Sequence, residues 1–236
     1  NIRTTEVIEI FAKSIIIATG GYSNLYNNYT TNSKSTTGDG IAAALRAGCE
    51  LSNMEMVQFH PTAMKDNNIL ISESARGEGG YLLDSKGERF VDELLSRDVV
   101  ARAINDKIST GNSVYLDLRH IGKDKLLEFM PQEYKVAKDF LDIEIDKELL
   151  PINPAVHYCM GGIKTNVSCE TNLRNLFACG EVSQSGIHGA NRLGGNSLLE
   201  IITFGKIAGK NAFINSLKNN TEFKENTLQL KMDKNK

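Results

Sequence analysis

"IIIATGG", residues 15–21, is a run of isoleucines that ends in two glycines. A continuous β-branched run is typical of a strand buried on both faces, as in a parallel sheet covered by helices. The alternating stretch that starts at residue 5 is expected to lead into this strand. A second apolar run, in "LFACGE" at 176–181, is likewise followed by a glycine, Gly180. The two runs predict an α/β fold with a ligand site where both strands end.

Three segments around these strands have the periodicity and the end signals of helices. An Ala-rich segment starts at Asp39 and runs to Gly48. Residues 97–109 follow Ser96, a favourable N-cap residue, and place several apolar side chains on one side. The apolar stretch 193–217 predicts a closing helix.

The middle of the chain has a different character. It contains short strand-like pieces, a turn at 84–87 and two short amphipathic helices within 123–148 that are interrupted at Pro131. We therefore predict a partial Rossmann-like domain with an inserted α+β domain. The expected division assigns 1–57 and 154–215 to the Rossmann-like domain and 58–153 to the insertion. Residues 216–236 are expected to be a linker or the start of a missing C-terminal helical domain.

Composition limits the function classes. The chain has 236 residues, 24% of them charged, and a formal net charge of −2, which gives no support for a nucleic-acid partner. No apolar run approaches the ~20 residues that cross a bilayer. The cysteines lack any metal-like spacing, so we expect no metal site and reduced, buried thiols of a cytoplasmic protein. They are Cys49, Cys159, Cys169 and Cys179.

The two glycine-terminated strands carry acids close by, Asp39 in "TGDG" and Glu181 in "CGE". Glycines let a phosphate or ribityl chain approach the backbone, and acids bind sugar-type hydroxyls. Ordinary strand-to-loop turns would explain either motif alone, but the two together favour a dinucleotide site. No G-x-G-x-x-G loop is present, so the main phosphate contact of such a site is missing from this sequence.

A second set of residues has the donors that a dicarboxylate requires. His60, Ser72, Arg97, His157 and Arg192 supply two imidazoles, two guanidinium groups and a hydroxyl. Each carboxylate needs charge-assisted donors, because a buried anion is costly when unpaired. Taken singly, each residue also fits a structural role, such as a turn cap or a satisfied core histidine.

In this order, the motifs of the chain resemble the flavoprotein subunit of succinate dehydrogenase/fumarate reductase, in the family that also includes L-aspartate oxidase. The matching strings extend over nearly all of residues 14–210. They are "ATGG", "TGDG", "MVQFHPT", "SESARGEGG", "GERFVDELLSRDVVARAI", "VYLDLRH", "PAVHYCMGGI", "LFACGEVSQSGIHGANRLGGNSLLE" and "FGKIAG".

This resemblance implies a bound FAD and a dicarboxylate substrate, and it assigns the inserted domain as a cap that closes over the site. The implied FAD contacts are Thr19, Gly20, Gly21, Asp39, Glu181, Ser197 and Leu198. The implied substrate-binding residues are His60, Ser72, His157 and Arg192. The implied proton donor is Arg97, fed by a relay of Glu73 and Arg76. The family usually has threonine where Ser72 stands, and serine keeps the hydroxyl but loses a methyl group.

The resemblance further implies interconversion of succinate and fumarate, with a hydride exchanged at flavin N5 and a proton passed through Arg97. It implies an iron–sulfur subunit and a membrane anchor as partners, and a peripheral location on the cytoplasmic face of the inner membrane. L-Aspartate oxidase is the alternative within the family, although it usually has Ala-Ser where Gly194-Gly195 stand. The missing G-x-G-x-x-G loop predicts an internal fragment of a longer flavoprotein. A non-catalytic piece that cannot hold FAD alone is the alternative of another class.

Overall fold

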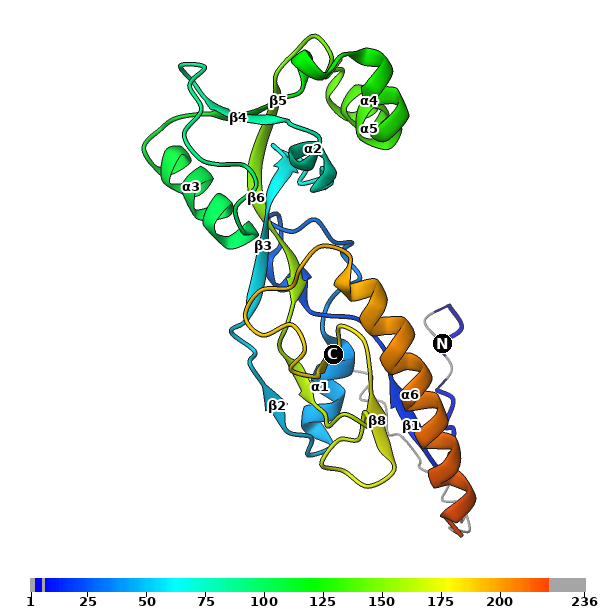
Figure 1. The fold of residues 1–236 in the computed structure, drawn as a ribbon. Helices are drawn as coiled ribbons and strands as arrows, with labels where there is room; N and C mark the ends of the chain where they lie inside the picture. The colour runs from blue at the N-terminus through cyan, green and yellow to red at the C-terminus, as the bar shows by residue number, and fades with distance from the viewer. Residues whose placement is uncertain (1–2, 6, 221–236) are drawn as a thin grey trace.

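The computed structural model describes residues 3–5 and 7–220, and its first strand is β1 (Ile15–Ile17). β1 pairs in parallel with β8 (Leu176–Ala178), so the carboxyl ends of the two glycine-terminated strands lie side by side as predicted. The long helix α6 (Asn196–Lys218) packs along this pair (Figure 1). The predicted α/β arrangement is therefore present at the point where a ligand site is expected.

The prediction that the first strand is buried on both faces was wrong. Ile15 and Ile16 are 51% and 41% exposed, and residues 7–13 are not in a strand. Among the described residues only β8 pairs with β1, so the other edge of β1 has no neighbouring strand.

Further elements complete this first lobe. Helix α1 (Asp39–Arg46) follows the turn η1 (Ser23–Tyr26) and the loop after it. A small sheet has the order β2-β7-β9. Its strands are β2 (Leu51–Ser52), β7 (Gly162–Lys164) and β9 (Ser183–Gln184). Side chains of α1, β7 and β8 share one buried cluster, so these elements form a single packed unit.

A second lobe is built on an antiparallel sheet of order β3-β6-β5-β4. Its strands are β3 (Val57–Met64), β4 (Tyr81–Asp84), β5 (Val114–Asp117) and β6 (Leu150–Cys159). Its helices are α2 (Ser74–Gly77), α3 (Arg97–Ser109), α4 (Lys123–Phe129) and α5 (Pro131–Leu141), with the short turn η2 (Arg119–Ile121).

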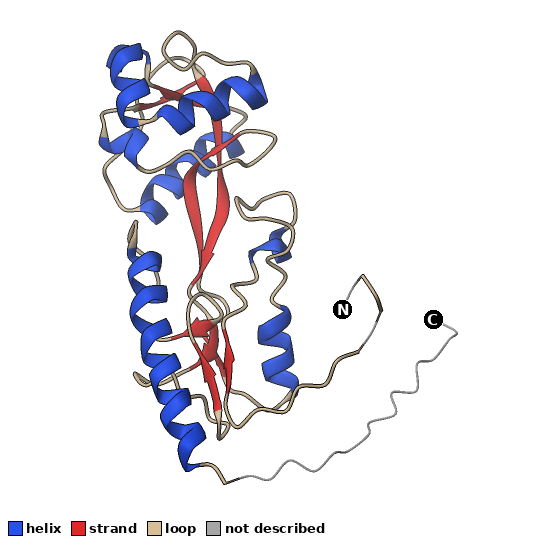
Figure 2. Ribbon diagram, turned by 90° about the vertical axis from the view of Figure 1, so that its right-hand side faces the viewer, coloured by secondary structure: helices blue, strands red, loops and turns tan. Residues whose placement is uncertain are grey.

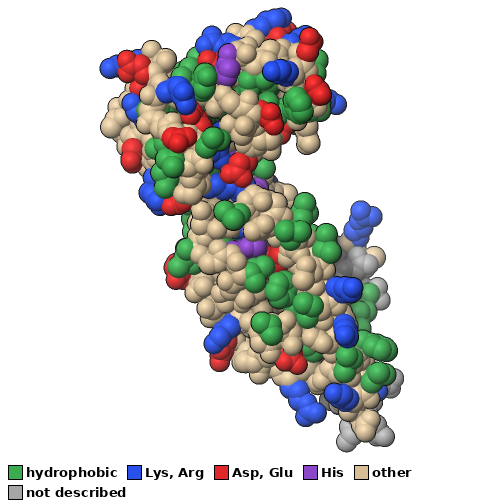
Figure 3. Space-filling model, viewed as in Figure 1, with side chains coloured by type: hydrophobic (Ala, Val, Ile, Leu, Met, Phe, Trp, Pro, Cys, Tyr) green, Lys and Arg blue, Asp and Glu red, His purple; other side chains and the backbone are tan. Residues whose placement is uncertain are grey.

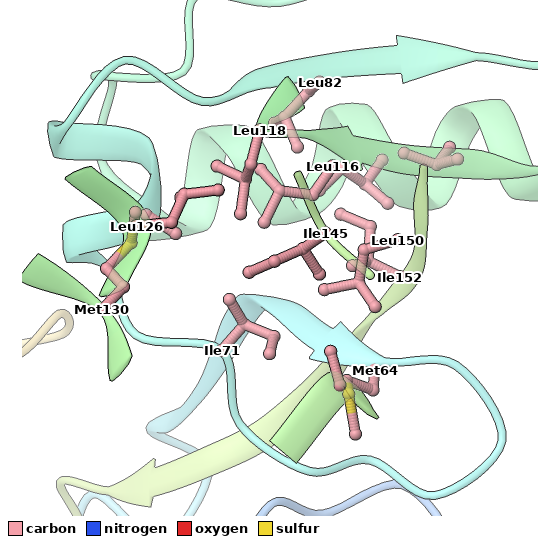
Figure 4. Packing of buried hydrophobic residues seen from close by; sticks show 14 of the residues in the cluster. Met64, Ile71, Leu82, Leu116, Leu118, Leu126, Met130, Ile145, Leu150 and Ile152 are labelled. Carbon is pink, nitrogen blue, oxygen red and sulfur yellow. The ribbon is translucent and has the colours of Figure 1, made fainter. Parts of the chain in front are cut away.

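The second lobe has its own hydrophobic core (Figure 4). Leu82, Leu116, Leu150 and Ile152, from three strands, are at most 1% exposed. Burial of each such side chain contributes about 1.5–3 kcal/mol. This core supports β3, α2 and α3, which carry His60, Arg76 and Arg97 of the candidate site.

Several local predictions were confirmed. Helix α3 spans the predicted residues 97–109, and Pro131 begins α5. Ser96 stands at the N-cap of α3 as predicted, but its hydroxyl donates to Asp98 and accepts no N–H of the helix. At the 84–87 turn the Gly87 N–H donates to the Asp84 carbonyl. The four cysteines are free and buried, as expected.

The ribbon formed by β3 and β6 joins the two lobes (Figures 1 and 2). The division of the chain at 57/58 and 153/154 stays a prediction, since β6 runs across the second border without interruption. Helix α6 reaches Lys218, and residues 221–236 of the predicted linker lie outside the described residues. No helix in the described part of the chain, α6 included, is long and apolar enough to cross a membrane.

Candidate functional site

Two histidines predicted to bind substrate meet on the ribbon between the lobes. His60 lies on β3 and His157 on β6, and their rings are 5.2 Å apart between centroids in an edge-to-face arrangement. The Thr62 N–H donates to Nδ1 of His60. The Thr31 hydroxyl lies 2.8 Å from Nδ1 of His157, and the Asn32 amide donates to the His157 carbonyl. Each ring thus has a partner on Nδ1.

Both imidazoles are held in the neutral form. Burial, followed by the positive charges of Arg192 and Arg97, lowers the pKa of His157 to about 4. Burial also lowers the pKa of His60 well below its usual range, with Arg97 as the next cause. A neutral imidazole still offers one N–H, so each ring can act as an uncharged donor.

The three residues of the predicted proton relay are in direct contact. The Arg97 guanidinium donates from Nη2 to Oε2 of Glu73 at 2.8 Å and from Nε to Oε1 at 3.3 Å. Arg76 donates from Nη2 to Oε1 of the same carboxylate at 3.0 Å. The hydrogen bond from Arg97 is the main reason why the pKa of Glu73 is lowered. An ionised Glu73 therefore bridges two buried arginines.

Arg192 lies just before α6 and is only 4% exposed. Its guanidinium stacks over the ring of Tyr158, 4.5 Å from the centroid, and Nη1 donates to the Leu193 carbonyl at 3.4 Å. Its Nε has no hydrogen-bond partner, and within the described residues no carboxylate forms a salt bridge with it. Burial is the main cause that lowers the pKa of Arg192. Such a buried, unpaired cation is costly unless an anion arrives.

Ser72 is near this cluster in the chain, but its hydroxyl has a local partner. It accepts a hydrogen bond from the Ser74 hydroxyl at 2.8 Å. Ile71, the residue before it, exchanges hydrogen bonds with Thr62, which follows His60 by two positions on β3. The structure thus places Ser72 beside the site without a hydrogen bond to His60 in the described geometry.

Sequence reasoning missed Gln58, which connects the two lobes at the site. Its Oε1 accepts a hydrogen bond from Arg97, and its Nε2 donates to the carbonyl of Arg192 and to Asn191. Strand alternation was the available signal, because residues 58 and 60 of a strand point to the same face. His188 and Asn191 also contact side chains here: Nε2 of His188 lies 2.9 Å from a carboxylate oxygen of Glu200, and the Asn191 amide donates to Asp98.

The predicted cofactor residues surround the carboxyl ends of β1 and β8. Gly21 lies so close to Glu181 that a Cβ on it would be 2.6 Å from Oε1. Thr19 packs against Gly40 at the start of α1, next to the exposed Asp39. Gly20 has a φ of +77° and open space where a Cβ would stand. Glu181 accepts the Cys159 N–H, and burial raises its pKa.

The remaining two predicted cofactor residues lie at the start of α6. Ser197 and Leu198 are its second and third residues, and Leu198 is 61% exposed. Gly195, at the N-cap, has a φ of +79° and no atom within 4 Å of a Cβ position. Charged and histidine side chains gather nearby, at the narrow junction between the lobes (Figure 3).

A cavity of about 790 Å³ opens beside this cluster, between α3, the ribbon and the loop after η1. It reaches Gln58 and Asn191, but none of the candidate substrate or cofactor residues lines it. The candidate site is therefore defined by the charged and hydrogen-bonding side chains at the junction of the lobes, and not by the cavity.

A family model for the FAD binding domain matches residues 1–198 of the chain. The chain belongs to this FAD-binding family. FAD is therefore the cofactor, as the sequence predicted, and the residues present fit it. Gly20 and Gly180, after β1 and β8, both have a positive φ, and Gly20 leaves backbone open to a ligand at the edge where α/β sheets bind nucleotides.

The relatives of this FAD-binding chain include flavoenzymes of two kinds. It is 41% identical to the fumarate reductase flavoprotein subunit of Escherichia coli over 90% of its own length and 39% of that protein. It is 45% identical to the L-aspartate oxidase of Clostridium acetobutylicum over 89% of its length and 50% of that protein. The chain thus spans half or less of these relatives.

Solved structures agree on the fold. The chain superposes on a quinol-fumarate reductase solved with menaquinol molecules, with a TM-score of 0.85 and 39% identity. The match covers 89% of this chain and 41% of that one. The predicted fold class, a partial FAD-binding domain with an inserted domain, agrees with this match.

Proposed function

We propose that the whole protein is an FAD-dependent oxidoreductase that interconverts succinate and fumarate at the junction of the two lobes. The observation that carries this proposal is Arg192, a buried guanidinium with an unpaired Nε and no carboxylate partner among the described residues. A substrate carboxylate would supply the missing charge and accept the free N–H.

The charge of the whole cluster supports a dianion rather than a single anion. Arg76, Arg97 and Arg192 are all at most 7% exposed, and Glu73 is the one carboxylate that bonds to any of them in the described residues. Three cations against one anion leave a net charge of two, which a dicarboxylate would balance. The two neutral histidines add donors without adding charge.

The proposed roles follow from these contacts. Arg192 and His157 bind one carboxylate, and His60 with Ser72 binds and polarises the other. Donors aimed at a carboxylate that gains negative charge in the transition state lower the barrier. Bound FAD, held by the glycine turns after β1 and β8, Asp39, Glu181 and the start of α6, would supply the hydride chemistry at one central carbon.

Arg97 is proposed to move the proton at the other central carbon. Free arginine is a very weak acid, with a pKa above about 12, so it needs a partner that restores its proton at once. Glu73 contacts both nitrogens on one edge of Arg97 and also bonds to Arg76. That continuous path supports the relay, and Gln58 holds the opposite edge of the guanidinium.

L-Aspartate oxidation is the second candidate, because relatives with that activity are as similar to the chain as the fumarate reductases are. Gly194-Gly195 favours the succinate/fumarate branch. The proposal extends to an iron–sulfur subunit and a membrane anchor as partners, with the protein peripheral on the cytoplasmic face of the inner membrane.

Turnover assays on the whole, flavin-loaded protein with succinate, fumarate and aspartate test the proposal. We expect succinate or fumarate activity and tight binding of malonate, a non-reacting dicarboxylate. Aspartate-dependent oxidation without succinate or fumarate activity would establish the second candidate instead.

Flavin absorbance of the purified 236-residue chain is a separate test, of whether this chain holds FAD by itself. A chain that cannot be loaded with FAD would be the non-catalytic piece.

A further inference from the structure

A second buried polar cluster lies next to Arg192, and the proposed function assigns it no role. It is centred on Glu200, in the second turn of α6, which is 2% exposed. The Tyr158 hydroxyl donates to Oε2 of Glu200 at 2.6 Å, and Nε2 of His188 lies 2.9 Å from the same oxygen. The Ser185 hydroxyl donates to Oε1 at 3.0 Å. Both carboxylate oxygens are therefore engaged.

These bonds fix the ring of Tyr158 from two directions. Glu200 holds its hydroxyl, and the ring of His188 meets it at 90° with centroids 5.5 Å apart. Burial raises the pKa of the Tyr158 hydroxyl, so it remains a donor. The face of this fixed ring carries the guanidinium of Arg192.

An aromatic face is a suitable support for a cation that must bind an anion. A carboxylate beside Arg192 would neutralise it and occupy the N–H groups that a substrate needs. The ring quadrupole instead attracts the guanidinium across its flat face and leaves its N–H edges without a competing carboxylate. The negative charge of Glu200 lies one ring further away, where it contributes attraction without competing for those N–H groups.

We propose that Tyr158 is a positioning residue, fixed by Glu200 and His188, that holds Arg192 ready for one carboxylate of the substrate. This role rests on the proposed function, because it presumes that Arg192 binds a dicarboxylate. The proposed support of Arg192 and one of the substrate donors are neighbours in the sequence. Tyr158 follows His157 on β6, so one strand both presents a substrate donor and supports the arginine beside it.

The test compares Tyr158→Leu, Tyr158→Phe and Glu200→Gln in the flavin-loaded whole protein. Malonate binding is measured by calorimetry, and kcat and KM are measured with the substrate. We expect Tyr158→Leu to weaken malonate binding roughly tenfold, the order expected for a desolvated cation–π contact. Tyr158→Phe keeps the face but frees the ring, so we expect roughly a threefold loss. Because the lost contact binds ground state and transition state alike, KM should rise while kcat changes little.

Tyr134→Phe is the matched control. Its hydroxyl also donates to a carboxylate, that of Asp146 at 2.7 Å, but within the second lobe. We expect this variant to bind malonate as the unaltered protein does. Thermal melting and flavin content of each variant separate a binding effect from a folding defect, and Tyr158→Phe decides the case if Tyr158→Leu does not fold.

A double-mutant cycle tests the chain of contacts itself. If Glu200 acts through the ring, Glu200→Gln weakens malonate binding in the unaltered protein and has no further effect beside Tyr158→Leu. Equal malonate affinity in the unaltered protein and both Tyr158 variants would overturn the role of Tyr158 alone. Failure of the unaltered protein to bind any dicarboxylate would overturn the proposed function and this role with it.

Discussion

Gly194 lies directly against the carboxylate of Glu73, so the loop before α6 touches the relay of the second lobe. A Cβ on Gly194 would overlap Oε2 of Glu73 and come within 3.2 Å of Nη2 of Arg97. The absence of a side chain at position 194 is thus what lets the two lobes meet at the proposed proton path.

Gly194→Ala should therefore reduce activity without unfolding the protein. The Glu73 carboxylate would have to leave its place between Arg97 and Arg76, and a displacement of about 1 Å at a reacting group costs up to roughly 100-fold in rate. We expect a 10- to 100-fold fall in turnover with a nearly unchanged melting temperature.

Gly209→Ala serves as its control. Gly209 lies within α6, and a Cβ there meets no atom within 4 Å. Alanine in a helix interior is favoured over glycine by about 0.5–1 kcal/mol, so this variant should keep its activity and melt slightly higher. Full turnover in Gly194→Ala would show that the Glu73 contact has no functional consequence.

Arg97→Lys tests the proposed proton donor. Lysine keeps the positive charge but loses the planar fork that bonds to Glu73 through two nitrogens and to Gln58 through a third. We expect turnover to fall by at least about 100-fold, the usual contribution of a positioned acid or base, while malonate still binds.

Arg102→Lys on the same helix is the matched control. Arg102 forms an exposed i,i+4 salt bridge with Asp98 on α3, and such pairs contribute little. Its turnover should equal that of the unaltered protein. An Arg97→Lys variant with full turnover would remove Arg97 from the mechanism.

Thr31→Val tests the bond that orients His157. The Thr31 hydroxyl is 2.8 Å from Nδ1 of that ring and comes from a loop that pairs with β6 through Thr30 and Val156. Valine has nearly the same shape but no hydroxyl, so the ring loses the partner that sets which nitrogen carries the proton. We expect KM for the dicarboxylate to rise by up to roughly tenfold, the cost of about one hydrogen bond.

For comparison, Thr110→Val removes a hydroxyl that donates to backbone carbonyls at the end of α3. This variant should show an unchanged KM. Equal KM values for the two threonine variants would mean that Thr31 does not orient the histidine.

Much of the site could be predicted from the sequence because its residues are placed by local structure. Glu73 and Arg76 are three residues apart around the short helix α2, so the contact between them follows from helical spacing. The paired ends of β1 and β8 likewise follow from two similar apolar runs. The first contact is set by a pattern within a few residues. The second is inferred from two such patterns together, because parallel strands of one sheet end at the same edge.

The contacts that the sequence did not predict join segments far apart in the chain. Gln58 meets the Arg192 carbonyl across 134 positions, and Thr31 meets His157 across 126. No local period encodes such a pairing, because it depends on how the ribbon brings the lobes together. The exposure of Ile15 and Ile16 was missed for a related reason. A run of isoleucines indicates that a strand can be covered on both faces, but not which segment covers it.

The neutral histidines make a prediction about stability and pH. The pKa of His157 is about 4 in the folded chain, against about 6.5 for an unperturbed imidazole, and that of His60 is lowered as well. Between these values the unfolded chain binds more protons than the folded one, so acidification favours unfolding. The full stability is present above about pH 6.5 and is lost progressively as the pH falls towards 4.

The urea midpoint of unfolding, measured from pH 7.5 down to 4.5, should therefore decline with falling pH. His157→Gln should show a shallower decline, because one of the two buried imidazoles is gone. Identical pH slopes in the two proteins would mean that His157 is not kept neutral by its surroundings.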